Sequence, residues 1–240
     1  MFSLFNTKQK LINTGILNGA TDWHSHILPG VDDGIQTMEE SLAVLDSYEK
    51  LGIREVWLTP HIMEDMPNTP DELRARFQEL QEAYEGSIIL HLAAENMLDN
   101  LFSERIESGD LLPIGSKGNH LLVETSYYQA PMDLYGTLKR IIEKGYQPIL
   151  AHPERYIYMT DKDYDYLSGM KVKMQMNLMS LAGGYGKSAQ DKAQSLLAKG
   201  YYSFFGSDLH RLSTFLSAIN TKALKKETVT LLPRIQNVIL

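Results

Sequence analysis

The feature that most constrains the fold of this chain is a series of short β-rich runs, each associated with a histidine or carboxylate of the kind that binds metal ions. The runs recur along the whole sequence, and packing alone does not explain such repetition. In an α/β barrel the strand ends converge on one face, so ligands distant in sequence meet there. The residues at the ends of these runs are His24, His26, His61, Glu95, Glu124, His152, Asp208 and His210.

Composition limits the class of protein. The 240 residues are 43% hydrophobic and 22% charged, which is enough for a full core and predicts a single domain over residues 1–240. The net charge of −7 argues against a nucleic-acid partner. The chain has no cysteine, so disulfides, thiolate-bound zinc and a cysteine nucleophile are excluded. Any chemistry must use water or an oxygen nucleophile.

The sequence shows neither a signal peptide nor a membrane-spanning segment. Residues 1–18 contain scattered apolar side chains without a continuous apolar core and cleavage site, and no later stretch is long enough to cross a bilayer. We therefore expect a cytoplasmic protein without membrane insertion. Residues 1–19 are expected to form an N-terminal arm, in which Phe2, Leu4 and Phe5 either pack on the barrel, meet a partner or lie in a disordered end.

Two helices are expected to begin at capping boxes. Thr37 and Thr69 are each followed three residues later by a glutamate, Glu40 and Glu72, and Pro70 suits the first helical position. Apolar residues follow at helical spacing in both cases, which gives each helix one buried stripe. Both helices are therefore expected to lie on a sheet.

Glycines predict where several strands begin. Gly52, Gly145 and Gly200 can each take the left-handed conformation that ends a helix, and each precedes a short β-rich run. This weak βα repeat predicts parallel strands. A seven-stranded (β/α) barrel is the preferred architecture, with an open doubly wound sheet as the alternative, because strand alternation does not show closure. The expected strands span residues 20–23, 54–59, 87–94, 120–124, 147–151, 171–176 and 201–205.

A mixed set of histidines and carboxylates is typical of a hydrolytic site with several metal ions. Imidazole binds zinc, iron and manganese, and carboxylates can bridge two ions. His24 and His26 alternate along a strand and can share one ion, and Asp208 and His210 could do the same. Each residue alone has an ordinary structural explanation. Together, burying so many charged groups on one face without metal would cost several kcal/mol for each unpaired charge, which favours a metal site.

Four other features are expected to be structural. His91 and His120 do not lie at the carboxyl ends of strands. The tyrosine pairs at 127–128 and 201–202 are expected to pack the barrel and not to form a substrate shelf. The glycine-rich run 181–186 lacks the Gly-Lys-Ser/Thr ending of a phosphate loop, and we expect it to be a flexible connection beside the site.

The ordered motifs resemble the polymerase-and-histidinol-phosphatase (PHP) superfamily, and within it the bacterial manganese-dependent protein-tyrosine phosphatases of capsular and exopolysaccharide systems. The discriminating motifs are Asp32-Asp33-Gly34 and His152-Pro153-Glu154-Arg155, which are more specific than His24-Ser25-His26. The resemblance extends from about Thr21 to Arg211. It implies a distorted (β/α)7 TIM-like barrel with three divalent metal ions, of which manganese is the first candidate and iron or zinc the alternatives.

The resemblance also implies the ligands of each ion. It assigns the first ion to His24, His26, Glu95 and Asp208, the second to Glu95, Glu124 and His152, and the third to Asp33, His61 and His210. Asp32 is the adjacent alternative to Asp33. Asn96 departs from the pattern, because these phosphatases often have an aromatic residue after the glutamate, and this puts substrate stacking at that position in doubt.

The expected mechanism follows from the ions. Water that bridges two cations loses a proton near neutral pH, so the resulting hydroxide can attack phosphorus in line while the cations neutralise the phosphate oxygens. Arg155 is the candidate that binds the phosphoryl group in a two-pronged fashion. Arg211 is a second candidate, whose alternative is an ordinary surface arginine.

The leading prediction is a tyrosine phosphatase that acts on a phosphotyrosyl protein, the tyrosine-rich tail of a bacterial kinase of polysaccharide export. This substrate rests on the resemblance alone. The alternatives are a small-molecule phosphomonoesterase such as histidinol phosphatase, and a non-catalytic metal-bound binding module. The sequence leaves the oligomeric state open.

Overall fold

The computed structural model describes residues 8–238. The strands are β1 (Gln9–Lys10), β2 (Thr21–Ser25), β3 (Glu55–Leu58), β4 (His61–Ile62), β5 (Ile89–Leu92), β6 (Glu95–Met97), β7 (His120–Glu124), β8 (Gln147–Ala151), β9 (Lys173–Asn177), β10 (Phe204–Gly206) and β11 (Lys222–Leu224). The α-helices are α1 (Met38–Leu51), α2 (Pro70–Ala83), α3 (Phe102–Ser108), α4 (Leu134–Glu143), α5 (Asp161–Gly169), α6 (Leu178–Ala182), α7 (Gly186–Lys199), α8 (Leu212–Asn220) and α9 (Lys226–Leu231). Short 3₁₀ helices are η1 (Leu11–Thr14), η2 (Pro153–Arg155) and η3 (Leu232–Arg234).

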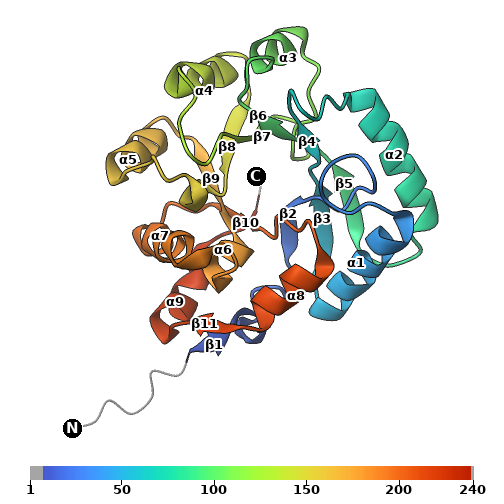
Figure 1. Cartoon of the computed structure of the whole chain (residues 1–240), viewed down its shortest axis with the longest axis vertical. Coiled ribbons are helices and arrows are strands. Elements are labelled where there is room, and N and C mark those ends of the chain that lie inside the picture. The colour runs from blue at the N-terminus through green and yellow to red at the C-terminus, as the bar shows by residue number, and fades with distance from the viewer. Residues whose placement is uncertain (1–7, 239–240) are drawn as a thin grey trace.

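The protein has a mixed α/β fold built on curled parallel sheets. One sheet has the order β10-β9-β8-β7-β6-β4 and a second has the order β2-β3-β5, and all neighbours within them are parallel. Figure 1 shows these strands curling around the middle of the molecule with the helices outside them. The short strands β1 and β11 form a separate antiparallel pair. The expectation of parallel βα units is confirmed.

Each of the seven expected strands overlaps a strand of the structure, but the short strands β4 and β6 were not expected. His61 and Glu95 follow the expected strands 54–59 and 87–94, as predicted. In the structure both residues begin a new strand, β4 and β6, in the other sheet. Pro60 lies at the first break, where it has no N–H to donate, although its carbonyl still accepts from the Glu95 amide at 3.1 Å. The pairing of β3 with β5 therefore continues into the pairing of β4 with β6.

Hydrogen bonds join the two parallel sheets beyond the end of β10. The Asp208 amide donates to the His24 carbonyl at 2.8 Å, and the His26 amide donates to the Leu209 carbonyl at 3.1 Å. The segment that carries Asp208 therefore lies directly against the end of β2. This contact brings the first and last candidate ligands in the sequence to the same place.

Local sequence explains where the helices begin and end. Thr37 and Thr69 both form the complete capping boxes expected of them, and Pro70 occupies the first turn of α2. Gly52 and Gly200 end α1 and α7 in the left-handed conformation, at φ of 87° and 77°. These predictions are confirmed, because they depend on residues close together in the chain.

The start of the chain packs against its end. β1 pairs with β11, and Leu11 and Leu17 are buried in the main core. Phe2, Leu4 and Phe5, on which the expected N-terminal arm partly depended, lie outside the described residues. Among residues 8–238 no helix combines the length and the apolar stretch needed to cross a bilayer.

Two apolar clusters fill the fold. The larger one contains most of the buried residues and includes side chains from the helices. The smaller one comes from strands and adjoining loops, and in it Trp23 and Trp57 stack with their ring centroids 5.8 Å apart and Phe204 lies 5.7 Å from Trp23. Trp23 immediately precedes His24, and alternation directs neighbouring strand side chains to different surroundings. The strands are thus fixed by apolar packing next to the residues that carry the candidate ligands.

Candidate metal centre

The structure brings eight of the nine candidate ligands into three overlapping groups, whereas His152 belongs to none of the three. Within each group, one ligand atom per residue lies within 4.8 Å of all the others. We call them the inner group (His24, His26, Glu95 and Asp208), the middle group (His61, Glu95 and Glu124) and the outer group (His26, Asp33, His61 and His210).

The inner group converges on one point. The Nε2 atoms of His24 and His26 lie 3.1 Å apart, and they lie 3.1 and 3.3 Å from the same oxygen, Glu95 Oε2. Asp208 Oδ1 is 3.6 Å from His24 Nε2 and 3.3 Å from His26 Nε2. Two imidazole nitrogens that face each other and two carboxylate oxygens form the donor set that a divalent cation prefers.

The middle group is built around Glu95 as well. His61 Nδ1 lies 3.1 Å from Glu95 Oε2 and 3.1 Å from Glu124 Oε1. His152 Nε2 lies on the other side of the same two carboxylates, 3.0 Å from Glu95 Oε1 and 3.8 Å from Glu124 Oε2. Glu95 therefore presents one oxygen to His24, His26 and His61 and the other to His152, which is the arrangement of a bridging carboxylate.

The outer group is open to solvent. Asp33 Oδ1 lies 3.5 Å from His61 Nε2 and 3.3 Å from His210 Nε2. The side chains of Asp33 and His210 are 57% and 26% exposed. The His26 and His210 rings stack with centroids 4.0 Å apart. The outer group thus forms the accessible edge of the cluster.

The structure separates the roles of the two adjacent aspartates. Asp32 Oδ2 accepts from His26 Nδ1 at 2.7 Å and from the His61 amide at 3.1 Å, so it holds the ring of His26 from behind. Burial alone would raise the pKa of Asp32, but His26 outweighs it and lowers the pKa to about 2. Asp33, one residue later, faces His61 and His210. Asp32 is thus placed to orient a ligand, whereas Asp33 is placed to be one.

Several buried polar atoms of the cluster fit a bound cation. Glu95 Oε2, Glu124 Oε1 and His61 Nδ1 are shielded from solvent and have no hydrogen-bond partner within the described part of the chain. Unpartnered buried carboxylate oxygens are costly. The atoms face one another in the middle group, so one divalent cation would supply a partner to all three. The residues therefore fit metal ions, and the clustered groups are able to bind them.

Burial and the facing charges act in opposite directions on the pKa values of the buried carboxylates in the cluster. Burial would raise the pKa of Glu95, but His24 and the other facing imidazoles outweigh burial and hold this pKa well below its usual range. Asp208 behaves in the same way, with His24 as its largest favourable partner. For His61, burial and His26 lower the pKa, and Glu124 and Glu95 outweigh them and raise it to about 10. The buried carboxylates are thus stabilised as anions by nearby positive charge, which protons on the histidines or bound metal ions can provide.

Two polar residues of β9 support the inner group, and the sequence analysis missed both. Gln175 Oε1 lies 3.0 Å from His24 Nδ1 and accepts from the His152 amide at 3.3 Å. Asn177 Nδ2 donates to Asp208 Oδ2 at 2.7 Å. The available signal was their spacing, because two amides separated by one residue at the end of an apolar strand share one face.

A buried network beneath β2 supports the same group. Asp22 Oδ1 accepts from the amides of Ser207 at 2.8 Å and His24 at 3.3 Å. The Tyr48 hydroxyl donates to Asp22 Oδ2 at 2.9 Å and lies 2.7 Å from Ser207 Oγ. The network ties α1 to the strand ends that carry His24 and Asp208.

Close backbone approach and unusual backbone geometry accompany the ligands. A Cβ on Gly206 would lie 2.5 Å from His24 Cβ, and a Cβ on Gly34 would lie 2.3 Å from the His26 carbonyl oxygen. His152 and Asp208 have positive φ, 32° and 50°. Such conformations cost energy in residues other than glycine and cluster at functional sites.

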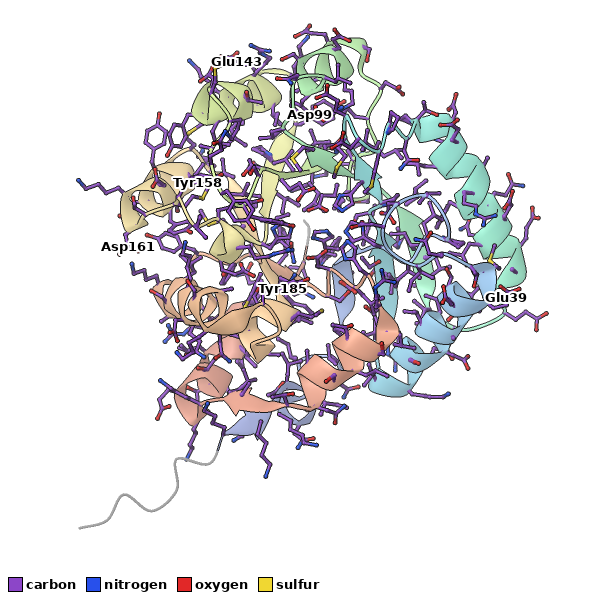
Figure 2. The ribbon with its side chains drawn as sticks, in the orientation of Figure 1. Glu39, Asp99, Glu143, Tyr158, Asp161 and Tyr185 are labelled. Atoms are coloured by element: carbon purple, nitrogen blue, oxygen red, sulfur yellow. The ribbon has the colours of Figure 1, made fainter. Side chains whose placement is uncertain are left out.

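Arg155 lies beside the cluster, held by residues that the sequence analysis assigned elsewhere. Its Nη1 donates to Asp208 Oδ2 at 2.8 Å. Its guanidinium carbon is 4.1 Å from the centroid of the Tyr127 ring and 4.0 Å from that of Tyr185. The expectation that Tyr127 packs the barrel is confirmed, because it packs against the main core, and its ring also covers a guanidinium at the site. In Figure 2, Tyr185 lies on the inner side of the ring of helices, whereas Glu39 and Asp161 lie at its outer edge.

The structure also bears on the predictions for the run 181–186, the other paired tyrosines and Arg211. Within the run 181–186, residues 183–185 connect α6 to α7, and Tyr185 of this connection lies beside the site, as expected. Of the remaining tyrosines, Tyr202 is buried and donates to Glu154 at 2.9 Å, and Tyr128 is 77% exposed. Arg211 immediately precedes α8 without a capping bond from its side chain, it is exposed, and no ion pair of its side chain occurs within residues 8–238.

His91, His120 and Asn96, which were not expected to bind metal, lie outside the ligand groups. His91 stacks on Trp57 at 4.5 Å and pairs with Glu55 at 2.8 Å. His120 begins β7, at the opposite end of the strand from Glu124, and belongs to none of the three groups. Asn96 is buried, and its Nδ2 donates to the carbonyls of Ala94 and Leu122, both at 3.2 Å. The Asn96 side chain thus serves the backbone of the sheet, and nothing at this position resembles a stacking surface for a substrate.

Comparison with known families identifies the chain. The model of the CpsB/CapC family, described as capsular polysaccharide synthesis, matches residues 20–225. The chain belongs to the CpsB/CapC family. The resemblance to capsular-system proteins is thereby confirmed, and the matched segment contains every candidate ligand as well as Arg155, Tyr127 and Tyr185.

Relatives of this CpsB/CapC protein are named as phosphatases. It is 27% identical over 210 residues to the tyrosine-protein phosphatase CpsB of Streptococcus agalactiae, covering 80% of this chain and 83% of the relative. It is 28% identical over 206 residues to CpsB of Streptococcus pneumoniae, covering 80% and 84%. The tyrosine-protein phosphatase YwqE of Bacillus subtilis is 26% identical over 199 residues, covering 80% and 78%.

Solved structures support the fold. A structure from the study of Bacillus subtilis YwqE and Streptococcus pneumoniae CpsB, described as metal-dependent tyrosine phosphatases, matches with a TM-score of 0.76 at 24% identity, covering 91% of this chain and 88% of that one. The phosphotriesterase homology protein of Escherichia coli matches with a TM-score of 0.54 at 11% identity, covering 90% and 98%. At these identities the likeness concerns the fold.

Proposed function

We propose that this CpsB/CapC protein is a metal-dependent protein-tyrosine phosphatase that hydrolyses phosphotyrosine in a protein substrate. The observation that carries the proposal is the position of Arg155 beside the inner of three overlapping groups of metal-type ligands, to which the carboxylate of Asp208 links it. A phosphoryl group needs cations around its oxygens, and this site offers a guanidinium next to a carboxylate-rich cluster that requires positive charge. The names of the bacterial relatives support phosphotyrosine as the substrate class.

The ligand groups support three divalent ions, with manganese as the first candidate and iron or zinc as alternatives. We assign one ion to each of the inner, middle and outer groups, with His152 completing the middle one on the far side of Glu95. Divalent cations bound there would lower the pKa of water and neutralise phosphoryl oxygens. Glu95 would bridge the first two positions, because its two oxygens face different histidines.

The remaining roles belong to this chain's own arginines. Arg155 has N–H groups beyond the one that binds Asp208, and in a rigid fork these can hold two phosphoryl oxygens. Arg211 follows His210 and is the second candidate for phosphate binding. The exposed Asp33 and His210 mark the side from which a bulky phosphoprotein reaches the cluster.

We extend the proposal to the barrel, the domain, the cellular location and the substrate. The joining of β2 to the segment after β10 supports closure of the sheets into a distorted (β/α)7 barrel, and one such domain would span residues 1–240. We further propose a cytoplasmic location and a substrate in the tyrosine-rich tail of a bacterial kinase of polysaccharide export, with oligomer formation left to measurement. The family's description as a capsular polysaccharide synthesis family supports this context.

The test is hydrolysis of a phosphotyrosyl peptide after chelation, with manganese, zinc or no metal added back. We expect phosphate release that depends on metal and is lost in His24→Ala. His91→Ala is the matched control, because this histidine lies outside all three ligand groups. It should retain activity close to that of the unmodified protein.

Substrate profiling separates the alternatives. A strong preference for histidinol phosphate over phosphotyrosyl peptides would replace the proposal with a small-molecule phosphomonoesterase. Folded protein that binds metal but releases no phosphate from any ester would indicate a non-catalytic binding module.

A further inference from the structure

The guanidinium of Arg155 lies between two tyrosine rings that come from different parts of the chain. Tyr127 belongs to the connection between β7 and α4, and Tyr185 directly precedes α7. Their ring centroids are 4.1 and 4.0 Å from the guanidinium carbon. Both distances are well inside the range in which an aromatic face attracts a cation. Arg155 is thus covered on both faces of its planar group.

A single ion pair fixes one edge of the same guanidinium. Arg155 Nη1 donates to Asp208 Oδ2 at 2.8 Å, whereas the other oxygen, Asp208 Oδ1, faces His26 and His24 in the inner group. Within residues 8–238 this is the one hydrogen bond found for the guanidinium. Its remaining N–H groups are therefore left for a ligand, and the side chain is 16% exposed.

The three contacts restrict Arg155 in complementary ways. The ion pair sets how far the guanidinium lies from the cluster, but it leaves rotation about the contact free. Rings on both faces fix the plane of the group, and that plane determines where the free N–H groups point. An arginine side chain otherwise carries about 2 kcal/mol of rotamer entropy that binding a phosphoryl group would have to overcome.

We propose that Tyr127 and Tyr185 are positioning residues that hold the Arg155 guanidinium in the orientation needed to bind a phosphoryl group at the metal cluster. The inference rests on the proposed function in that it takes a phosphate ester as the ligand. The tyrosines act through Arg155 and through their rings. The Tyr185 hydroxyl also donates to Asp208 Oδ2, but at 3.4 Å this bond is longer than the usual O–H···O range, so we assign the larger contribution to the ring.

The experiment measures binding of inorganic phosphate to the manganese-loaded protein by titration calorimetry. Tyr127→Leu and Tyr185→Leu remove a ring, whereas Tyr127→Phe and Tyr185→Phe keep it. Each change is made in the unmodified protein and in an Arg155→Ala background. Tyr166→Leu is the control, because Tyr166 is a half-exposed tyrosine of α5 whose ring packs on Tyr135 and not on a cation.

We expect each leucine variant to weaken phosphate binding by about 3- to 30-fold, as the strength of cation–π contacts implies. The phenylalanine variants and Tyr166→Leu should stay within about twofold of the unmodified protein. In the Arg155→Ala background the leucine changes should have no further effect, since the group that the rings orient is gone. Hydrolysis of a phosphotyrosyl peptide and of a small alkyl phosphate should fall by the same factor.

Two results would overturn the inference. Equal losses with and without Arg155 would show that the rings act on something else. A loss confined to the phosphotyrosyl peptide, with phosphate binding unchanged, would show that the rings stack on the substrate's aromatic ring. Phosphate binding also separates the two proposals, because ring-dependent binding in a protein that hydrolyses no phosphotyrosine would contradict the proposed function alone.

Discussion

The inner and outer ligand groups share His26 but have opposite surroundings. In the inner group the side chains of His24, Glu95 and Asp208 are at most 1% exposed. In the outer group Asp33 is 57% exposed and His210 is 26% exposed. The inner group is thus enclosed by the fold, whereas two residues of the outer group, Asp33 and His210, remain open to solvent.

Support from surrounding residues follows the same division. Gln175, Asn177 and the network of Asp22, Tyr48 and Ser207 hold the ligands of the inner group through hydrogen bonds. Asp33 has no comparable anchor among the described residues, and its contacts are to the facing histidines. A ligand held by neighbours is preorganised for a cation, whereas an exposed ligand must be ordered by the cation itself.

The largest expected effect is that of Asp208→Asn. This change removes a buried charge from the inner group and from Arg155. We expect metal-dependent activity to fall by about 10³-fold, since bound cations supply several kcal/mol of transition-state stabilisation and about 1.4 kcal/mol corresponds to a factor of ten. The measurement is kcat/KM with a phosphotyrosyl peptide, together with the metal content of the protein. A loss no larger than that of Asp33→Asn would remove the distinction between the two groups.

The next effect is that of Gln175→Leu, which removes the amide that orients His24 without removing a ligand. We expect about 10- to 100-fold weaker metal binding, the range for partners of metal-ligating histidines. Competition with a fluorescent chelator measures the affinity. Gln190→Leu is the control, because this buried glutamine bonds the Leu181 carbonyl and belongs to no ligand group. Equal affinity in both variants would contradict the role of Gln175.

A smaller effect is expected for Asp33→Asn in the outer group. The half-exposed charge interacts through water, so its loss should cost on the order of 1 kcal/mol, or about fivefold in activity at limiting metal. High concentrations of manganese should restore most of the activity. The readout is kcat/KM as a function of added metal. Failure of rescue at saturating metal would show that Asp33 acts in the reaction as well as in holding a cation.

The smallest effect on activity is expected for Tyr48→Phe, which tests whether the inner group depends on the fold beneath it. Loss of the hydroxyl leaves Asp22 Oδ2 and Ser207 Oγ short of a partner. We expect the free energy of unfolding in a chelator to fall by about 1–3 kcal/mol, with little change in metal-saturated activity. Urea unfolding measures it. Tyr166→Phe at the exposed site on α5 should leave stability unchanged, and equal stability of the two variants would show that the network does not support the inner group.

The sequence predicted best the features that depend on neighbouring residues. The capping boxes at Thr37 and Thr69 and the left-handed Gly52 and Gly200 occur as expected. Each requires only a few residues and a local hydrogen-bond pattern. The strands overlap their expected ranges for the same reason, although the sequence did not indicate that His61 and Glu95 begin further strands in the other sheet.

The sequence determined the identities and chain order of the candidate ligands, because strand ends that carry histidines and carboxylates recur along it. It did not reveal Gln175 or the tyrosines that cover Arg155, since these residues acquire their roles from partners far away in the chain. Tyr127 and Tyr185 come from separate connections, and only the folding of both over η2 places them on the two faces of one guanidinium. The sequence favoured Asp33 over Asp32 as a metal ligand but gave no contacts for either, and the tertiary structure separates them by their partners, because Asp32 faces His26 Nδ1 whereas Asp33 faces His210 in the outer group.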